Sequence, residues 1–405
     1  MRAIHSFRAP WRHYVSLDPR KQTTTRAITF ASIKKELLSR QPRTYTDRVV
    51  DQKLKQLFVS VPPLNLPKNE KSLDFDTFND FYCLLTPGSQ PLLPQGHHLI
   101  FNNAQHPIDS LLPDGTDSDH CPGPPFTHRL WAGGSIAFPQ GWRYDFAKKL
   151  NATWTCRETI TDVRLKGCAL PGDYTSIGTG IGQKIFVDVK RDYQLYSSKG
   201  LHRDPFIVER RTLCFVPQTS PKNIKEALEQ PSNKSIRTPI SFPQDCAASY
   251  SQTFNFTPTM LFRFSALTFN AHKIHLDLQH CRKVEGYRNL LVHGPLLLML
   301  MFSVLNSRGH MVASLDYQNL APVFVDEEIK VRVQQRKSNW SVYIVGPQND
   351  LRVKGTAILE EKATNGHCAN QEEEEADESN KKSMEFAGNE RPSTKFMERL
   401  TPQDQ

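Results

Sequence analysis

Two histidines, His275 and His293, stand on either side of a short linker, and the second comes just before the apolar segment GPLLLMLMFSVL. A neutral imidazole can take or give a proton near physiological pH, so it suits general acid–base catalysis. A helix that begins at Gly294-Pro295 would present free N–H groups and a positive dipole end to an anionic oxygen. The spacing therefore indicates proton-transfer chemistry at the mouth of a buried helix.

The helix expected after Gly294 is apolar on every side, which is typical of a helix that is buried all round. Its longest apolar run, residues 296–305, is half of the ~20 residues that a bilayer crossing needs. We therefore expect a helix at the centre of a folded sheet and no membrane insertion.

Other interpretations of these histidines compete with the catalytic one. His272 and His275 lie three residues apart, as metal ligands can, but no third ligand is spaced nearby, so we predict no metal. A loop histidine is more often structural, and for His293 we favour a hydrogen bond at the helix entry over direct proton transfer.

The segment from Phe264 to His275 reads FSALTFNAHKIH and is followed by VHG at 292–294. This pattern resembles the MaoC-like, hotdog-fold (R)-specific hydratase and dehydratase family. The positions that match are Phe264, Thr268, Ile274, His275, Val292, His293 and Gly294. Four positions depart from it: Phe269, Asn270, His272 and Lys273 stand where the family has Gly, Asp, Asn and Pro. The segments HHLIFNN (97–103), LLPDGTD (111–117) and HRLWAGGSIAF (128–138) also resemble the fungal mitochondrial branch of the family.

The resemblance implies a role for each matched residue. His275 is the implied catalytic base, Asn270 occupies the position of the family's catalytic Asp, and Gly294 supplies the backbone donor to the thioester carbonyl. Because an asparagine at position 270 cannot take a proton, a second proton-transfer group is needed. His272 and Asp277 are candidates that match no family position, and we rank His272 above Asp277. Two further residues complete the expected substrate-binding set with Gly294, namely His293 and Phe264. No cofactor is implied, because the thioester itself provides the activation.

Hydrophobic periodicity and turn residues divide the chain into segments. We predict a helix over 33–61 and a helical patch at 75–85. Strands are predicted near 152–167, 182–196, 206–217, 252–264, 311–320, 329–335, 340–345 and 351–360. With the resemblance, this order predicts an α+β double hotdog, in which two antiparallel sheets each wrap a central helix. The predicted parts are a first hotdog domain without the motif (33–217), a linker (218–245), a second hotdog domain with the motif (246–365) and an acidic disordered tail (366–405).

The first 32 residues have the composition of a mitochondrial targeting segment. They are rich in arginine and hydroxylic residues, and Asp18 is the only acid before Glu36. A basic disordered tail is the alternative. The eight cysteines form no C-x-x-C pair, which favours a reducing compartment, and the net charge of +9 suits an anionic partner such as CoA or acyl carrier protein. No basic run alternates with aromatic residues, so we expect no nucleic-acid binding.

Together these features predict a mitochondrial matrix enzyme, a 3-hydroxyacyl-thioester dehydratase resembling the type 2 enzymes of fatty-acid synthesis. It would remove water from (R)-3-hydroxyacyl thioesters to give trans-2-enoyl thioesters. One alternative is a catabolic enoyl-CoA or mesaconyl-type CoA hydratase, and another is a non-catalytic acyl-thioester binding module. The sequence leaves the oligomeric state open, a homodimer being one option.

Overall fold

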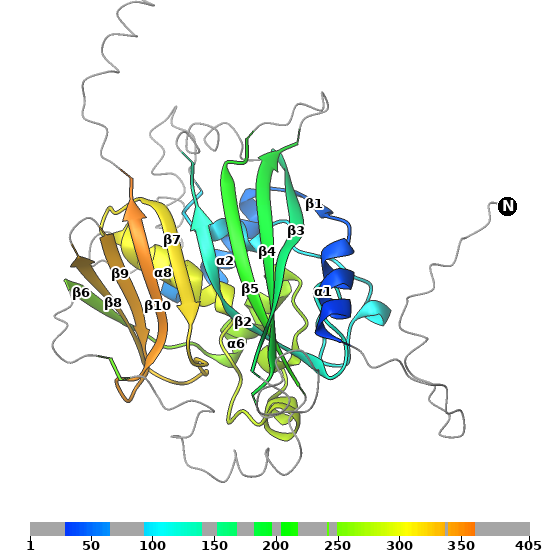
Figure 1. Ribbon diagram of the computed structural model, residues 1–405. Coiled ribbons are helices and arrows are strands. Elements are labelled where there is room, and N and C mark those ends of the chain that lie inside the picture. Colours follow the sequence, from blue (N-terminus) through cyan, green and yellow to red (C-terminus); the bar gives the residue numbers. More distant parts are fainter. Residues whose placement is uncertain are drawn as a thin grey trace, which may run out of the picture. The chain divides into compact units, whose positions relative to one another are not determined.

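Ten strands of the described chain form one antiparallel sheet in the order β1-β3-β4-β5-β2-β7-β10-β9-β8-β6 (Figure 1). The computed structural model describes residues 29–64, 93–139, 152–167, 182–196, 204–217, 241–242, 249–336 and 339–360. The predicted 75–85 patch, most of the targeting segment, most of the 218–245 linker and the acidic tail lie outside these residues. The strands are β1 (Arg43–Arg48), β2 (Phe126–Ala137), β3 (Thr153–Lys166), β4 (Lys184–Leu195), β5 (Ile207–Pro217), β6 (Tyr250–Phe254), β7 (Val312–Asn319), β8 (Ile329–Arg336), β9 (Asn339–Val345) and β10 (Leu351–Leu359).

The two predicted antiparallel sheets, that of the first half (β1–β5) and that of the second half (β6–β10), are joined edge to edge into one sheet. Strand β2 pairs with β7 in antiparallel register, with Gly134 opposite Tyr317. The backbones approach closely there: a Cβ atom on Gly133 would lie 2.5 Å from the carbonyl oxygen of Tyr317. Pairing the two strands satisfies N–H and C=O groups that two free sheet edges would expose. The first and second halves therefore share one sheet.

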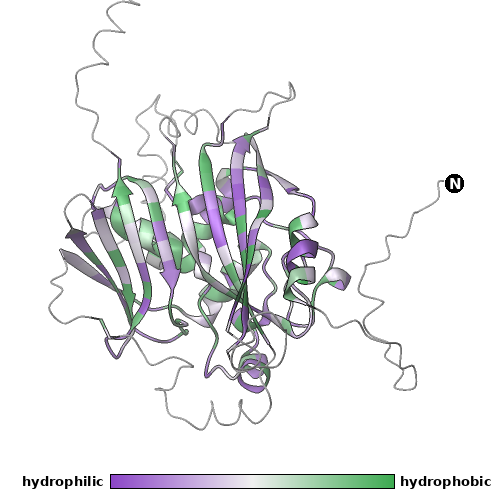
Figure 2. Cartoon of the chain, viewed as in Figure 1, coloured by the Kyte–Doolittle hydropathy of each residue, from purple (hydrophilic) through white to green (hydrophobic). Residues whose placement is uncertain are grey.

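The helices are α1 (Phe30–Ser39), α2 (Asp51–Ser60), α6 (Pro258–Thr268), the single turn α7 (Leu278–His280) and α8 (Gly294–Ser307). Short turns are η2 (Pro62–Leu64), η3 (His97–Ile100), η4 (Ile108–Ser110), η5 (Lys273–His275) and the π-helical η6 (Cys281–Glu285). The apolar helix α8 lies against the second half of the sheet, and nine of its side chains are buried (Figure 2). Its residues share one core with Leu54 and Leu57 of α2, so the largest apolar core extends across both halves.

Two predicted elements are wrong in type. The helix expected over 33–61 is divided into α1, β1 and α2. Pro42 is incompatible with a helix interior, and the β-branched Thr44 and Thr46 favour a strand. The strand expected over 252–264 ends at Phe254, and α6 follows because Thr257 caps its N-terminus and Pro258 occupies its first turn. The predicted strands in 152–217 and 311–360 are confirmed to within two residues.

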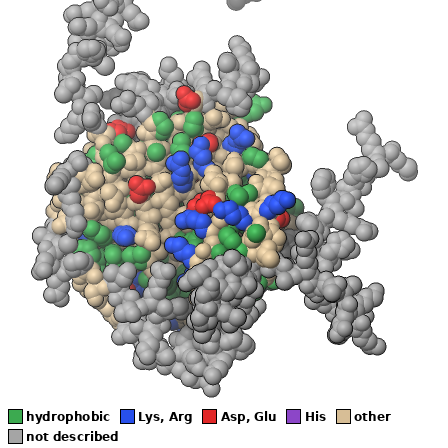
Figure 3. Space-filling view, viewed as in Figure 1, with side chains coloured by type: hydrophobic (Ala, Val, Ile, Leu, Met, Phe, Trp, Pro, Cys, Tyr) green, Lys and Arg blue, Asp and Glu red, His purple; other side chains and the backbone are tan. Residues whose placement is uncertain are grey.

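The face of the sheet turned away from the core carries basic side chains in the first half. Strand β3 alternates buried residues such as Trp154 and Cys156 with exposed ones such as Arg157, as a strand with one wet face does. Arg164, Lys166 and Arg210 are also exposed. Lys and Arg side chains gather over this part of the sheet (Figure 3).

The core around α8 predicts a large difference between two phenylalanine truncations. Phe302 of α8 is fully buried and meets the ring of Phe138 edge-on at 5.6 Å, whereas Phe262 of α6 is 64% exposed. Phe302→Ala should lower the free energy of unfolding by about 3–5 kcal/mol. Phe262→Ala should change it by less than about 0.5 kcal/mol. Urea denaturation of both variants checks this, and equal losses would contradict the assigned packing of α8.

Candidate active site

His275 lies at the end of the short turn η5, where the chain leaves α6 and approaches the start of α8. Its side chain is nearly buried, with 7% exposure of the residue. Nδ1 lies 2.8 Å from the carbonyl oxygen of Leu291, which can only accept a hydrogen bond. Nδ1 therefore carries the proton, and Nε2 is left as an acceptor on the side of the cavity that His275 lines.

His272 and Asn270 come from the same loop but point to different partners. The Asn270 carboxamide oxygen accepts a hydrogen bond from the backbone N–H of His272 at 3.0 Å. The His272 ring meets the His275 ring edge-on at 5.5 Å and is also buried. Asn270 therefore shapes the loop that carries His272, and all three residues line the cavity.

The other candidate from this loop, Asp277, lies elsewhere. It is exposed, and its carboxylate caps the turn α7 by accepting a hydrogen bond from the N–H of His280 at 3.0 Å. Phe269 adopts a left-handed conformation with φ of 55° at the C-terminus of α6. This conformation explains why glycine suits the position, and here the chain follows it with a bulky residue.

His293 is fully buried beneath His275. The two rings stack in nearly parallel planes with centroids 3.6 Å apart, and Phe264 meets His293 edge-on at 5.0 Å. His293 Nε2 lies 2.8 Å from the hydroxyl oxygen of Ser265. Phe264 and His275 line the cavity, and His293 supports the His275 ring from behind.

Gly294 is the first residue of α8 and lines the cavity. A Cβ atom at this position would lie 3.1 Å from the side chain of Trp131, which comes from β2. Trp131 is held by hydrogen bonds from its indole N–H to the Tyr317 hydroxyl at 2.7 Å and from the Asn319 amide to its carbonyl oxygen at 2.8 Å. The first half thus closes one side of the helix entry, where first-turn N–H groups have no partner within the helix.

The first half also supplies polar residues to the site that the sequence patterns did not assign. His128 of β2 donates from Nδ1 to Glu285 at 2.7 Å, and His280 lies 3.2 Å from the other oxygen of Glu285. Asp114 lies in the loop before β2, with its Oδ2 3.6 Å from His272 Nε2. The only sequence signal for these residues is the resemblance of the 111–117 and 128–138 segments to the fungal branch, which gave them no role.

Burial dominates the electrostatics of the histidines. It lowers the pKa of His275 to about 4, although the hydrogen bond to Leu291 acts in the opposite direction. Burial also lowers the pKa of His272 and of His293 well below the usual range, and neighbouring histidines add to this effect. Burial pushes the pKa of His128 down as well, but the hydrogen bond and charge of Glu285 outweigh it, so that pKa is raised. His272, His275 and His293 are therefore neutral at pH 7.

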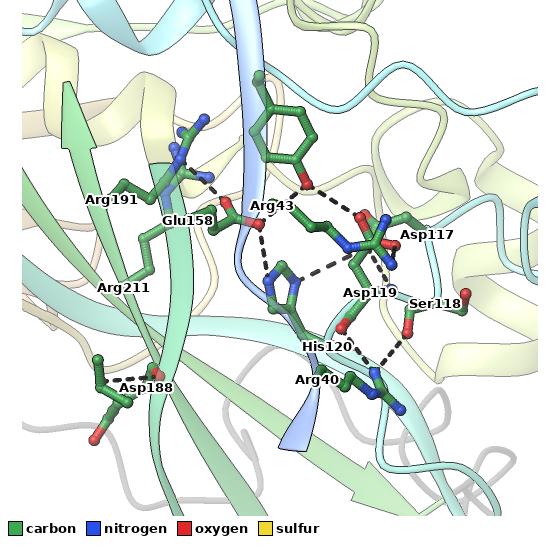
Figure 4. Close-up of polar contacts among 12 residues, drawn as sticks. Arg40, Arg43, Asp117, Ser118, Asp119, His120, Glu158, Asp188, Arg191 and Arg211 are labelled. Carbon is green, nitrogen blue, oxygen red and sulfur yellow. Dashed lines mark hydrogen bonds and ion pairs between the residues drawn. The ribbon is translucent and has the colours of Figure 1, made fainter. Parts of the chain in front are cut away.

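The cavity has a volume of about 2120 Å³ and is lined by both halves of the described chain. In its first-half wall, Glu158 accepts from His120 at 3.0 Å and pairs with Arg191 at 3.1 Å (Figure 4). Asp119 pairs with Arg43 at 2.9 Å on the other side of His120. These charges are matched, so the network serves to hold the wall of the cavity. Within the described ranges, no three His, Cys, Asp or Glu side chains converge as metal ligands, and no helix is long and apolar enough to cross a membrane.

The antiparallel sheet that the two halves share, with the neutral His275 in the loop before the apolar helix α8, places this chain in the MaoC-like class of hotdog proteins. A solved MaoC-like dehydratase from Phytophthora capsici has this fold, with a TM-score of 0.51 over 81% of this chain and 99% of that one at 13% identity. The family model for hydroxyacyl-thioester dehydratase type 2 matches residues 96–325. The chain belongs to this family and is a hydro-lyase.

Two relatives are similar to this chain in amino-acid sequence. The mitochondrial hydroxyacyl-thioester dehydratase type 2 of Schizosaccharomyces pombe is 27% identical over 275 residues, which are 64% of this chain and 83% of the relative. The mesaconyl-C(4)-CoA hydratase of Chloroflexus aurantiacus is 40% identical over 125 residues, which are 30% of this chain and 44% of that protein.

The lowered pKa of His275 makes stability dependent on pH. Between about pH 4 and the usual value of 6.5 the unfolded chain binds a proton at this residue that the folded chain does not, so the free energy of unfolding falls as pH is lowered through this window. His275→Gln should flatten the dependence by up to about 3 kcal/mol between pH 7 and pH 4. Urea denaturation at several pH values measures this, and identical slopes for wild type and variant would show that His275 is not buried neutral.

Proposed function

We propose that this protein removes water from (R)-3-hydroxyacyl thioesters carried on phosphopantetheine, giving trans-2-enoyl thioesters in mitochondrial fatty-acid synthesis. The observation that carries the proposal is the placement of His275, with Nε2 free beside the cavity, near Gly294 at the start of α8. The named mitochondrial relative supports the compartment, and the arginine-rich leader agrees with it.

The proposed chemistry uses the thioester to acidify the α carbon. His275 Nε2 takes the α proton, and the electron pair moves toward the thioester oxygen, where the Gly294 N–H and the helix dipole stabilise the negative charge. The electron pair then returns to form the C2–C3 double bond, and the C3–O bond breaks. The leaving hydroxyl receives the proton that His275 Nε2 took from the α carbon and departs as water, which returns His275 to its neutral state. We propose that Asn270 and His272 orient the hydroxyl, that Phe264 bounds the acyl group, that His293 supports the His275 ring, and that no cofactor takes part.

The proposal extends to how the chain divides into structural units. We propose that residues 33–217 and 246–365 are two hotdog units around central helices, with α8 in the second and α2 as the counterpart in the first. The shared apolar core that contains both helices supports this arrangement.

A catabolic hydratase acting on CoA thioesters is the second candidate function. The 40% identity to the mesaconyl-C(4)-CoA hydratase over 125 residues favours it specifically. Both reactions use the same site, since hydration is the reverse of dehydration, and the two candidates differ in the carrier and the acyl group.

Replacement of His275 should identify the base. With crotonyl-CoA and crotonyl-carrier protein as substrates, loss of the enoyl absorbance measures hydration. His275→Ala should lower kcat by about 10²–10⁴. His310, which does not belong to the described cavity lining, is the matched control, and His310→Ala should keep native turnover. A His275→Ala variant with native turnover would refute the catalytic role.

The basic outer face of β3 and β5 predicts how an acidic carrier protein would bind. Opposite charges on partners raise their rate of encounter, and salt weakens this effect. Arg157→Glu combined with Arg210→Glu should lower kcat/KM about tenfold for crotonyl-carrier protein at low salt and leave crotonyl-CoA unaffected. Lys330→Glu in β8 is the control, because Lys330 is exposed in the other half. Equal losses for both substrates would argue against this docking face.

A further inference from the structure

One carboxylate oxygen of the first half is buried next to the loop of residues 269–277, here called the motif loop, and has no hydrogen-bond partner among the residues that the structure describes. Asp114 uses Oδ1 to accept from the backbone N–H and the hydroxyl of Thr116, at 2.9 and 2.8 Å. Its other oxygen, Oδ2, is buried, accepts no hydrogen bond from the described part of the chain, and lies 3.6 Å from Nε2 of His272. A buried acceptor without a donor is costly, so the nearby imidazole N–H is its natural partner.

The Asp114 loop is fixed against the motif loop by its backbone. The carbonyl oxygen of Asp114 accepts from the N–H of Lys273 at 2.8 Å. Gly115 packs so closely on the motif loop that a Cβ atom there would lie 2.0 Å from the carbonyl oxygen of Ala271. The approach of Asp114 to His272 is therefore built into the way the two halves meet, and a small side-chain rotation makes it a hydrogen bond.

The other carboxylates around the site have partners. Glu285 bonds His128 and His280, Asp117 pairs with Arg129 at 2.9 Å, and Asp277 caps a turn in solvent. Asn270, at the family's Asp position, has its carboxamide oxygen on the backbone of the loop. Among the described residues, Asp114 is the carboxylate that lies within ion-pair distance of one of the three site histidines, His272, His275 and His293.

We propose that Asp114 is a positioning residue that accepts a hydrogen bond from Nε2–H of His272 and so holds that imidazole with Nδ1 as its acceptor. Asp114 does not line the cavity, whereas His272 does, so the carboxylate acts through the histidine. The carboxylate that the motif loop lacks at position 270 is thus supplied by the first half. This inference rests on the proposed function, because it assigns His272 to the same reaction.

The test is a double-mutant cycle with Asp114→Asn and His272→Ala in the full chain. Asparagine keeps the Oδ1 contacts to Thr116 and replaces Oδ2 with an amide donor, which cannot accept from Nε2–H. Asp114→Asn should lower kcat for crotonyl-thioester hydration roughly 10- to 100-fold, the usual scale for losing a partner that orients a histidine. KM should change less than about twofold. In the His272→Ala background, Asp114→Asn should have no further effect. Asp109→Asn, an exposed residue in the preceding turn, is the matched control and should keep native kcat.

Two outcomes overturn the proposal: native kcat in Asp114→Asn, or losses that multiply fully in the double variant. If Asp114→Asn does not fold, His272→Ala alone decides, since it leaves the Thr116 turn intact, and native kcat in that variant refutes the pair. Ring-nitrogen NMR of histidine-labelled protein is a readout that does not depend on activity. It should show the Nε2–H tautomer for His272 in the wild type, and the Nδ1–H tautomer would refute the pair. A wild type without any hydratase activity would refute the proposed function, and the tautomer would still test the contact.

Discussion

The pairing of β2 with β7 is the interaction on which the rest of the structure depends. It joins Gly133 and Gly134 to the strand that follows α8, and at Gly133 the two backbones lie at a distance that only a missing side chain permits. Because of this contact, Trp131 closes the side of the helix entry at Gly294. Its indole N–H donates to the Tyr317 hydroxyl and its carbonyl oxygen accepts from the Asn319 amide, both in β7. The candidate active site is consequently a product of the junction between the halves, although every residue of the recognised motif lies in the second half.

Burial sets the chemistry of that junction. The motif histidines give up contact with water and remain neutral, which is the state that a general base needs. Directional contacts then decide what each ring can do: Leu291 fixes the proton of His275, Ser265 holds His293, and the stack between the two rings keeps His275 in place. His128 differs because the Glu285 carboxylate outweighs the effect of burial and raises its pKa. The same cavity therefore contains one imidazole with a raised pKa and others with lowered pKa values.

The sequence predicted the elements whose pattern is local. The strands after 152 and 311 alternate clearly, and α8 is apolar all round, so both were found without a structure. Prediction failed where a short cap or breaker outweighed the average composition, as at Pro42 and at Thr257-Pro258. It also could not assign Asp114 or His128, because their roles depend on contacts with residues far along the chain. A motif match identifies the family, but the proximity of Asp114 to His272 becomes visible only in the way the two halves meet.

The hydrogen bond between Lys273 and the Asp114 carbonyl has a consequence for folding. It joins positions 114 and 273, and the β2–β7 ladder closes a similarly long loop. Contacts between distant segments form late, because the chain must first lose the entropy of closing the loop. Local helices and hairpins can form before the motif loop packs against the first half. Recovery of activity during refolding is therefore expected to lag behind recovery of secondary structure, so the site itself reports when the two halves have found their register.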